Sequence, residues 1–357
     1  MRVGLVFGGR SVEHRVSVSS ARTVAAGLSE AGHEVVALGI AENGCWVDRQ
    51  LGESALRGDI DSLSAASDGI VASLRHLLEC DIDVIFPVVH GTWGEDGTLQ
   101  GLCEMLDLPY VGADVTASAI AMDKLQCKRL LTACGISVVD YETVSLPDMR
   151  RSLADCLELV ERLSLPVFVK PSCGGSSAGV RRVTRRADLP GALEFALQFD
   201  DAVVVEKEIV GRELECSVLG DETLQASVIG EIVPGNEFYD YEDKYLQDDA
   251  ELKMPAELPA AVSQEVRGLA IRAFAAVGGS GMARVDFLMD RDGAIYVNEI
   301  NTLPGFTRIS MYPKLWQLSG VSLAELVDRL VEIAVARHQR RQSLDTTIKS
   351  WFAEIGN

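Results

Sequence analysis

The sequence lacks any uninterrupted apolar run of about 18 residues, the minimum that an α-helix needs to cross a lipid bilayer. A protein with helical membrane spans is therefore not expected. The apolar stretch at residues 2–7 is too short for a signal peptide, and its composition is typical of a buried first strand. We therefore expect a cytoplasmic protein.

Paired cysteines are absent and histidine is scarce. The eight cysteines are scattered along the chain without any Cys-x-x-Cys pair, and only five histidines are present. These features disfavour a zinc site, so we expect reduced thiols that serve mostly as small core residues.

Basic residues are few relative to acidic ones. The chain has 33 Lys and Arg against 53 Asp and Glu, which gives a formal net charge of -20. Such a charge argues against nucleic acid or an anionic membrane surface as a partner. If the protein binds a polyanion such as ATP, it must do so with a few local cations and a metal ion.

Two common nucleotide-binding motifs are also missing. The chain has no Gly-x₄-Gly-Lys-Ser/Thr P-loop, and no Gly-x-Gly-x-x-Gly follows the first predicted strand. The missing Gly-x-Gly-x-x-Gly counts against a nicotinamide-dependent dehydrogenase, although the N-terminal strand and helix pattern could suggest one.

The 357 residues, 47% of them hydrophobic, can form a large core divided over two or three domains. Strand and helix patterns alternate in the N-terminal part, which predicts an α/β fold with a doubly wound parallel sheet. Domain limits are expected near residues 122 and 213, and the polar stretch 47–68 is expected to be a surface connection. The predicted strands are 2–7, 34–40, 83–89, 166–170, 179–183, 201–206, 213–219 and 225–232, with a hairpin at 283–299. The predicted helices are 17–31, 70–79, 97–106, 116–134, 150–163, 259–277 and 322–338.

The predicted hairpin would place chemically active side chains on one face. An Asp-Gly pair at 292–293 separates its arms and is a strong turn signal. With that pair as the turn, Asp286 faces Glu299 and Arg284 faces Asn301, and strand residues two apart share a face. Three oxygen ligands beside a guanidinium suit Mg²⁺ bound together with substrate phosphates. The alternative is a surface hairpin with charged pairs.

A Gly- and Ser-rich loop at 172–179 follows Lys170 at the end of a predicted strand. The free backbone N–H groups of such a loop can wrap phosphate oxygens, although a plain turn between strands is an equal alternative. The predicted strand 201–206 ends in Glu206 and is followed by Lys207, and the backbone groups of these two residues could contact the edge of an adenine. Glu213 could accept hydrogen bonds from ribose hydroxyls.

Two loops that follow N-terminal strands carry acidic residues. The segment 90–100 (HGTWGEDGTLQ) opens a helix, at a position where α/β sheets tend to carry functional loops. Its Glu95 and Asp96 could equally be favourable charges at a helix N-terminus. In the segment 8–17 (GGRSVEHRVS), Glu13 could hold an ammonium group or could again be an acid at a helix start.

Together these segments resemble the D-alanine–D-alanine ligase family of the ATP-grasp superfamily. The resemblance extends from residue 8 to residue 313, with the motifs in the order of the family. The motifs are GGRSVEH (8–14), HGTWGEDG (90–97), MDK (122–124), KPS with GSS (170–177), FYDYEDKY (238–245), NEINTLPGFT (298–307) and SMYP (310–313).

The resemblance implies a three-domain ATP-grasp architecture with ATP gripped between the second and third domains. On this basis we expect an N-terminal α/β domain at 1–122, a central domain at 123–213, a C-terminal domain at 214–342 and a tail at 343–357. The stretch 236–250 resembles the mobile lid loop of the family. The resemblance also implies a homodimer.

The resemblance further implies a role for individual positions. The residues implied in binding ATP are Lys124, Lys170, Ser177, Glu206, Lys207, Ile209, Glu213 and Lys244. Those implied in holding two Mg²⁺ ions, with Mn²⁺ as a substitute, are Asp286, Glu299 and Asn301. Those implied beside the first D-alanine are His90 and a hydrogen-bonded triad of Glu13, Ser176 and Tyr245. The implied oxyanion site consists of Arg284 and the Gly305 N–H, and the implied ligands of the second D-alanine carboxylate are Ser310 and Met311.

The implied reaction serves peptidoglycan precursor synthesis and has two steps. The carboxylate of one D-alanine attacks the γ-phosphate to give an acyl phosphate, and the amine of a second D-alanine then attacks that carbonyl and expels phosphate. The lid pattern around Tyr245 fits the dipeptide-forming type, while joining D-alanine to D-serine stays an alternative and D-lactate is less favoured. A non-catalytic nucleotide-binding module would predict the loss of a metal ligand or of Arg284, and all are present.

Overall fold

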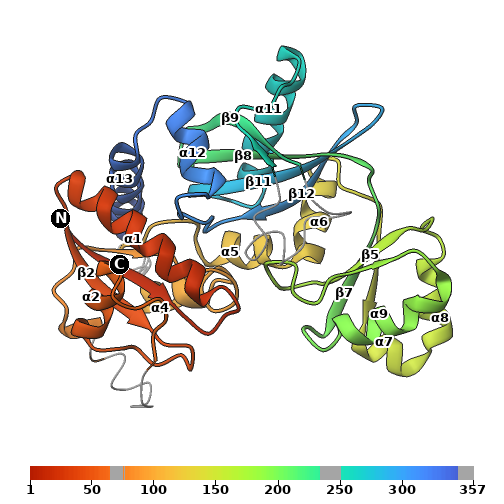
Figure 1. The fold of residues 1–357 in the computed structure, drawn as a ribbon, viewed down its shortest axis with the longest axis horizontal. Helices are drawn as coiled ribbons and strands as arrows, with labels where there is room; N and C mark the ends of the chain where they lie inside the picture. The colour runs from red at the N-terminus through yellow and green to blue at the C-terminus, as the bar shows by residue number, and fades with distance from the viewer. Residues whose placement is uncertain (65–74, 76, 234–250, 345–357) are drawn as a thin grey trace, which may run out of the picture.

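The computed structural model describes residues 1–64, 75, 77–233 and 251–344, and this part of the chain folds around three β-sheets (Figure 1). The strands are β1 (Arg2–Gly8), β2 (Glu34–Ile40), β3 (Val84–Pro87), β4 (Tyr141–Ser145), β5 (Val167–Pro171), β6 (Arg181–Val183), β7 (Ala202–Lys207), β8 (Gly211–Gly220), β9 (Leu224–Val233), β10 (Glu251–Lys253), β11 (Gly281–Asp290) and β12 (Ile295–Asn301). The helices are α1 (His14–Glu30), α2 (Arg49–Arg57), α4 (Thr98–Met105), α5 (Val115–Met122), α6 (Lys124–Ala133), α7 (Leu146–Arg151), α8 (Leu153–Val160), α9 (Leu189–Ala196), α11 (Ala260–Ala276), α12 (Met311–Leu318) and α13 (Leu323–Gln342). None of the helices in this described part combines the length and the apolar character that a membrane span requires.

The N-terminal sheet is parallel, with the strand order β2-β1-β3. Val3, Leu5 and Phe7 of β1 face a core shared with α1 and α13, whereas Val6 belongs to a second core shared with α4. Alternate residues of β1 are therefore buried against opposite layers, and both faces of the sheet are covered. This arrangement confirms the predicted α/β class with a doubly wound parallel sheet.

The second sheet is antiparallel, with the strand order β4-β7-β5-β6. Val167, Val169, Val203 and Val205 of its central strands form one core cluster with apolar residues of α8 and α9. Figure 1 shows this sheet and its helices gathered in a lobe of their own, away from α1 and the N-terminal sheet.

The third sheet is also antiparallel and has the order β10-β9-β8-β11-β12. On β8, Leu214 and Cys216 join the core beneath α11. Ser217 instead donates to the Tyr312 carbonyl of α12 at 3.4 Å, which places α12 on the opposite face. Because successive strand residues point to opposite faces, the sheet has an apolar face that packs against α11 and a more polar face on which α12 lies.

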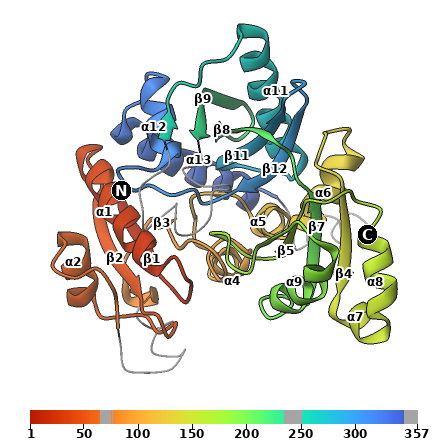
Figure 2. The same cartoon turned by 45° about the vertical axis from the view of Figure 1, so that its right-hand side comes forward.

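Several helices pack across the predicted domain limits. Ala117 of α5 and Cys127 of α6 belong to the core of the third sheet, together with Phe287. The long helix α13 packs against α1 at the other end of the chain, and Figure 2 shows α5 and α6 lying beneath β11 and β12. The limit predicted at 213 falls within β8. The domain limits themselves stay a prediction.

Two of the predicted helices are interrupted by capping residues. The predicted helix 116–134 is divided into α5 and α6, because Asp123 leaves the helical conformation (ψ 101°) and its side chain accepts from the Leu125 N–H. The predicted helix 150–163 is likewise divided into α7 and α8, with Ser152 as the N-cap of α8. A single continuous helix was the wrong prediction in both places.

The prediction of a surface connection at 47–68 is also wrong in part. Asp48 caps the helix α2 by accepting from the Leu51 N–H, and Gly58 ends it in the left-handed conformation. Ala55 of this helix is buried in the N-terminal core. The predicted helix 70–79 lies mostly outside the described residues.

Candidate active site

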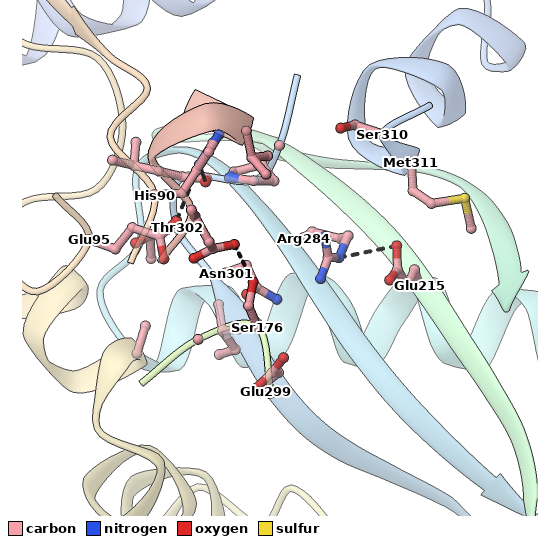
Figure 3. Close-up of a pocket in the computed structure, with 18 of the residues that line it drawn as sticks. His90, Glu95, Ser176, Glu215, Arg284, Glu299, Asn301, Thr302, Ser310 and Met311 are labelled. Atoms are coloured by element: carbon pink, nitrogen blue, oxygen red, sulfur yellow. Dashed lines mark hydrogen bonds and ion pairs between the residues drawn. The ribbon is translucent and has the colours of Figure 1, made fainter. Parts of the chain in front are cut away.

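Two adjoining pockets lie between the three sheets, and we call them pocket A and pocket B. Pocket A is lined by Glu13, His90, Arg284, Asn301, Gly305, Ser310 and Met311, among others (Figure 3). Pocket B is lined by Lys170, Ser177, Glu206, Lys207, Ile209, Glu213 and Asp286, among others. Lys124, Ser176 and Glu299 line both. Every predicted site residue in the described part of the chain therefore borders at least one pocket.

The loop after β1 reaches pocket A through a tight turn that needs glycine. Gly8 has a φ of +90°, and a Cβ at this position would lie 2.1 Å from a carbonyl oxygen of β2. His14 fixes the end of the loop, since its Nε2 accepts from the Leu63 N–H (2.9 Å) and its Nδ1 donates to the Gly9 carbonyl (2.8 Å). This anchoring presents Glu13 to the pocket.

Glu13 contacts the Gly- and Ser-rich loop of the second sheet. Ser176 Oγ donates to Glu13 Oε1 at 2.6 Å, and Ser176 and the residue after it have φ values of +50° and +58°. Such values are uncommon outside glycine and indicate a loop held in a strained shape. Two members of the predicted triad are thus in contact. The third, Tyr245, lies outside the described residues with Lys244 and the rest of the predicted lid at 236–250.

Lys124 reaches the same loop from the start of α6. Its Nζ donates to the Gly174 carbonyl at 2.7 Å and lies 3.7 Å from Glu299 Oε2. The interruption between α5 and α6 at Asp123 orients Lys124 toward this loop. Ser172 Oγ of the loop donates to the Asp123 carboxylate at 2.6 Å. Lys124 therefore supplies a cation at the boundary between the two pockets.

His90 follows β3 and is only 3% exposed. Its Nδ1 donates to the Leu303 carbonyl at 2.9 Å, and its Nε2 lies 3.0 Å from Ser20 Oγ. Burial lowers the pKa of His90, but the Glu95 and Glu13 carboxylates outweigh burial and raise the pKa overall. Burial also raises the pKa of Glu95, whose Oε1 lies 3.8 Å from His90 Nδ1. Glu95 is therefore a charge partner of His90 in pocket A.

The hairpin of β11 and β12 brings the predicted metal ligands together. Its register pairs Asp286 with Glu299 and Arg284 with Asn301, as the sequence predicted. Both pairs border the pockets on the polar side of the third sheet. The pairing that the metal hypothesis requires is therefore present.

The turn of this hairpin differs from the predicted two-residue turn. The Gly293 N–H donates to the Asp290 carbonyl (3.1 Å) and the Asp290 N–H donates to the Ala294 carbonyl (3.0 Å), so three residues lie between the last hydrogen-bonded pair, Asp290 and Ala294. This longer turn alone would shift every pair by one residue and reverse the two faces. An irregularity between Asp286 and Phe287 restores the predicted pairing.

Arg284 is held by two carboxylates in the wall of pocket A. Its Nε and Nη2 donate to the two oxygens of Asp286 at 2.7 Å each, and Nε lies 3.1 Å from Glu215 Oε2 (dashed in Figure 3). Burial disfavours the charge, but Asp286 and Glu215 outweigh it and raise the pKa of Arg284 well above its usual value. Arg284 is therefore a permanent cation.

The oxygen donors of the hairpin suit a hard divalent cation. Asp286 and Glu299 supply carboxylates, and Asn301, whose Nδ2 donates to Asp286 at 3.0 Å, adds an amide oxygen. Across the described ranges, no group of three or more His, Cys, Asp or Glu side chains could hold a metal by itself. Two carboxylates with an amide fit Mg²⁺, which keeps waters and binds with substrate phosphates, better than a metal that needs a closed protein cage.

A buried ion triad lies beside pocket B. The Glu206 carboxylate contacts Lys170 Nζ at 2.6 Å and Lys128 Nζ at 2.9 Å, and the side chains of Glu206 and Lys128 are 3% and 1% exposed. Burial alone would raise the pKa of Glu206, but the two ammonium groups outweigh it and hold the pKa at about 2. The triad therefore carries one net positive charge.

The segment between β12 and α12 closes the far end of pocket A. Ser310 Oγ accepts from the Thr307 N–H at 2.9 Å, and a Cβ at Gly305 would lie 2.8 Å from that oxygen. The Ser310 side chain does not cap α12, so the first N–H groups of this helix can bind an anion at the positive end of its dipole. Figure 3 shows Ser310 and Met311 at one end of the pocket and His90 at the other.

Comparison with known proteins assigns the chain to a family. Residues 2–113 match the family model described as the D-ala D-ala ligase N-terminus, and residues 130–332 match the D-ala D-ala ligase C-terminus. The chain is 45% identical over 359 residues to D-alanine–D-alanine ligase A of Chromobacterium violaceum, an alignment that covers 96% of this chain and 98% of that protein. The chain belongs to the D-alanine–D-alanine ligase family. It is also 42% identical over 364 residues to D-alanine–D-alanine ligase A of Escherichia coli K12, with 98% of this chain and 99% of that protein covered.

Solved structures related to the D-alanine–D-alanine ligase family share this fold. The D-alanine–D-alanine ligase from Coxiella burnetii superposes with a TM-score of 0.80 at 36% identity and covers 96% of this chain and 97% of that one. The VanG D-Ala:D-Ser ligase from Enterococcus faecalis also has a TM-score of 0.80, at 32% identity, with coverages of 93% and 99%. The predicted family and ATP-grasp fold class are confirmed.

Sequence reasoning missed three residues of this ligase-family site. Glu215 lies opposite Asp286 in the pairing of β8 with β11, and strand alternation could have placed it on the polar face. Lys128 follows Lys124 by four residues, a spacing that puts both on one side of a helix. Ser20 gave no signal, because a buried serine within a helix is ordinary.

Proposed function

We propose that the protein joins two D-alanine molecules into D-alanyl-D-alanine, with ATP as the energy source and D-alanyl phosphate as the intermediate, for peptidoglycan precursor synthesis. The observation that carries this proposal is the convergence of three lobes on pockets A and B. Glu13 comes from the N-terminal lobe, Lys170 from the second sheet, and Arg284 with Asp286 from the third. Such a site can hold two small amino acids beside a nucleotide, and the family supplies the substrate class.

In this proposal pocket B binds ATP. Glu206, Lys207 and Ile209 line the position of the adenine, and Glu213 lies where it can accept from the ribose hydroxyls. Lys170 and Lys124, with the backbone of Ser176 and Ser177, face the phosphates. The net positive triad around Glu206 supports this assignment, because a chain with a net charge of -20 must concentrate its cations where a polyanion binds.

We propose that Asp286, Glu299 and Asn301 hold the metal, with Mg²⁺ as the expected ion and Mn²⁺ as a substitute. Two bound ions would neutralise charge on the transferring phosphoryl group and fix its orientation. The chain's own contribution is to keep the two carboxylates paired across the hairpin.

The first D-alanine is proposed to bind near the loop after β1. Glu13 would hold its ammonium group, because the carboxylate lies in the wall of pocket A with Ser176 fixing one of its oxygens. His90 would lie near its carboxylate, supported by the Leu303 carbonyl and by Glu95. These contacts would leave one carboxylate oxygen directed toward pocket B.

The second D-alanine is proposed to bind between Arg284 and α12. Ser310 and the Met311 N–H would hold its carboxylate at the positive end of the helix. Arg284 and the Gly305 N–H would stabilise the oxyanion that forms when its amine attacks the acyl phosphate. Both groups line pocket A.

A variant ligase that joins D-alanine to D-serine is the second candidate. It is supported by the VanG structure from E. faecalis, a D-Ala:D-Ser ligase that shares the fold at 32% identity. The curated relatives from C. violaceum and E. coli, at 45% and 42% identity, are D-alanine–D-alanine ligases and favour the dipeptide-forming reaction.

The assembly and location belong to the same proposal. We expect a homodimer in the cytoplasm, by analogy with the family. We also propose three domains with the first limit near residue 122, and we move the second limit from 213 to the loop before β8, because a limit inside a central strand would divide the third sheet.

The direct test is phosphate release by the purified protein with ATP and Mg²⁺. D-alanine alone, D-alanine with D-serine and D-alanine with D-lactate are compared, and the products are identified by mass. We expect D-alanyl-D-alanine from D-alanine alone. A mixed product with little turnover on D-alanine alone would identify a variant ligase, and no phosphate release with any pair would reject the proposal.

A further inference from the structure

A buried serine of the N-terminal lobe contacts the segment that carries the Gly305 N–H. Ser20 lies on α1 and is 0% exposed. The Phe306 N–H donates to Ser20 Oγ at 3.1 Å, and His90 Nε2 lies 3.0 Å from the same oxygen. Ser20 therefore connects the substrate loop after β3 with the segment between β12 and α12.

Two of the hydrogen bonds around Ser20 and His90 have a fixed direction. The Leu303 carbonyl can only accept, so His90 Nδ1 carries a proton, which it donates at 2.9 Å. Nε2 accepts from the Ser20 hydroxyl in the neutral imidazole and donates to it in the imidazolium, and in both forms the hydroxyl oxygen accepts from the Phe306 N–H. Alanine at this position would leave a buried backbone N–H without a partner, which is costly.

The network holds both ends of a short segment. Leu303 and Phe306 flank Gly305, and each is hydrogen-bonded through its backbone to the N-terminal lobe. The Phe306 ring is buried between Phe86 and Tyr312, with centroid distances of 6.2 and 5.4 Å. Within the described part of the chain, the Gly305 N–H has no hydrogen-bond partner of its own. Its direction is therefore set by the anchored residues on either side.

We propose that Ser20 is a positioning residue for the second step of the reaction. Through Phe306 and His90 it aims the Gly305 N–H at the oxyanion of the tetrahedral intermediate. Oxyanion donors act by being preorganised, and small displacements of such groups are costly. Formation of the acyl phosphate does not use this donor in the proposed function, on which the inference rests. Ser20 also contacts His90, which is proposed to lie beside the first D-alanine, so loss of Ser20 should slow dipeptide formation much more than the first step.

The test compares Ser20→Ala and Ser118→Ala with the wild-type enzyme. Ser118 is a matched control, since it is also 0% exposed within a helix and its hydroxyl donates only a long bond of 3.4 Å to the Ala113 carbonyl. Rapid-quench single turnovers measure ADP and D-alanyl-D-alanine separately. For Ser20→Ala we expect ADP formation to slow by no more than about threefold and the dipeptide to form on the order of ten- to a hundredfold more slowly. The KM for ATP should not change.

A conservative variant and three outcomes make the test decisive. Ser20→Cys keeps a weak donor and acceptor and should be intermediate in its rate of dipeptide formation. An unchanged rate in Ser20→Ala, an equal loss in Ser118→Ala, or equal slowing of ADP and dipeptide would each overturn the assignment. Wild-type protein that makes no dipeptide would instead contradict the proposed function, and this control is measured first.

Discussion

A single buried lysine, Lys128, gives the ion triad beside the proposed nucleotide pocket its surplus positive charge. Without Lys128, Glu206 and Lys170 would form a neutral pair, because the Glu206 carboxylate would neutralise the Lys170 ammonium. With Lys128 at 2.9 Å from the second Glu206 oxygen, the triad has a surplus positive charge beside pocket B. Lys128 itself does not line the pocket, so we expect it to act through Glu206.

We predict that Lys128→Met raises the KM for ATP on the order of tenfold, because the lost charge leaves Glu206 to neutralise Lys170 in a poorly screened site. The KM for D-alanine should change little. Arg129→Met is the control, because this substitution removes the same charge from an exposed neighbour of Lys128 on the same helix. Steady-state kinetics at varied ATP, on variants whose thermal melting shows a folded state, decide the matter. Equal effects of the two substitutions would disprove a local role.

We predict that Asp286→Ala lowers turnover by more than about a hundredfold. Even the mutation of a residue that only supports a metal ligand commonly lowers metal affinity or activity about ten- to a hundredfold. The variant loses a proposed metal ligand and also the carboxylate that holds Arg284. Asp292→Ala, an exposed substitution in the turn of the same hairpin, should keep wild-type activity. Phosphate release over a range of Mg²⁺ concentrations is the measurement, and full activity of Asp286→Ala would remove the metal assignment.

At the scale of elements, the hairpin of β11 and β12 has the pairing that the sequence predicted, but its turn is not the predicted one. The Asp-Gly signal correctly indicated a turn, and Asp286 does face Glu299. The turn has one residue more than predicted, and an irregularity beside Phe287 compensates for it. Because a one-residue slip exchanges the two faces, both features are needed to keep the ligands together.

We predict that Gly293→Ala lowers the free energy of unfolding by about 1 kcal/mol, because Gly293 has a φ of +88° that residues with a Cβ adopt at a cost. Gly191→Ala is the matched control. Both glycines have open space where a Cβ would lie, but Gly191 belongs to the helix α9, where alanine is preferred. Urea denaturation should show a loss for the first and no loss for the second. Equal losses would show that the turn geometry does not matter.

The helix predictions failed where capping competes with hydrophobic periodicity. Asp123 and Ser152 lie within long apolar patterns, and their side chains instead bind the backbone N–H groups of the next helix. The helices α9 and α12 were not predicted, because eight residues give too few turns for a clear pattern. Most strands were predicted more closely, since buried β-branched runs are a stronger local signal, but the short strands β4 and β10 were not predicted.

At the scale of the whole molecule, the sequence could not show which distant elements pack together. The buried Arg337 of α13 donates to the Tyr110 carbonyl at 2.8 Å and to the Gly112 carbonyl, which fastens the C-terminal helix to the N-terminal lobe. Nothing near Arg337 in the sequence indicates these partners. The site residues could be named from family motifs, but contacts such as Ser20 with Phe306 join segments 286 residues apart and required the fold.

The central claim is that pockets A and B together ligate D-alanine through an acyl phosphate. The most direct measurement starts from D-alanine labelled with ¹⁸O in both carboxylate oxygens and analyses the released phosphate by mass. If a carboxylate oxygen attacks the γ-phosphate and then leaves with it, each phosphate must carry one ¹⁸O atom and the dipeptide must lose one. Unlabelled phosphate, with the ¹⁸O atom that is lost on dipeptide formation recovered in water instead, would contradict the account.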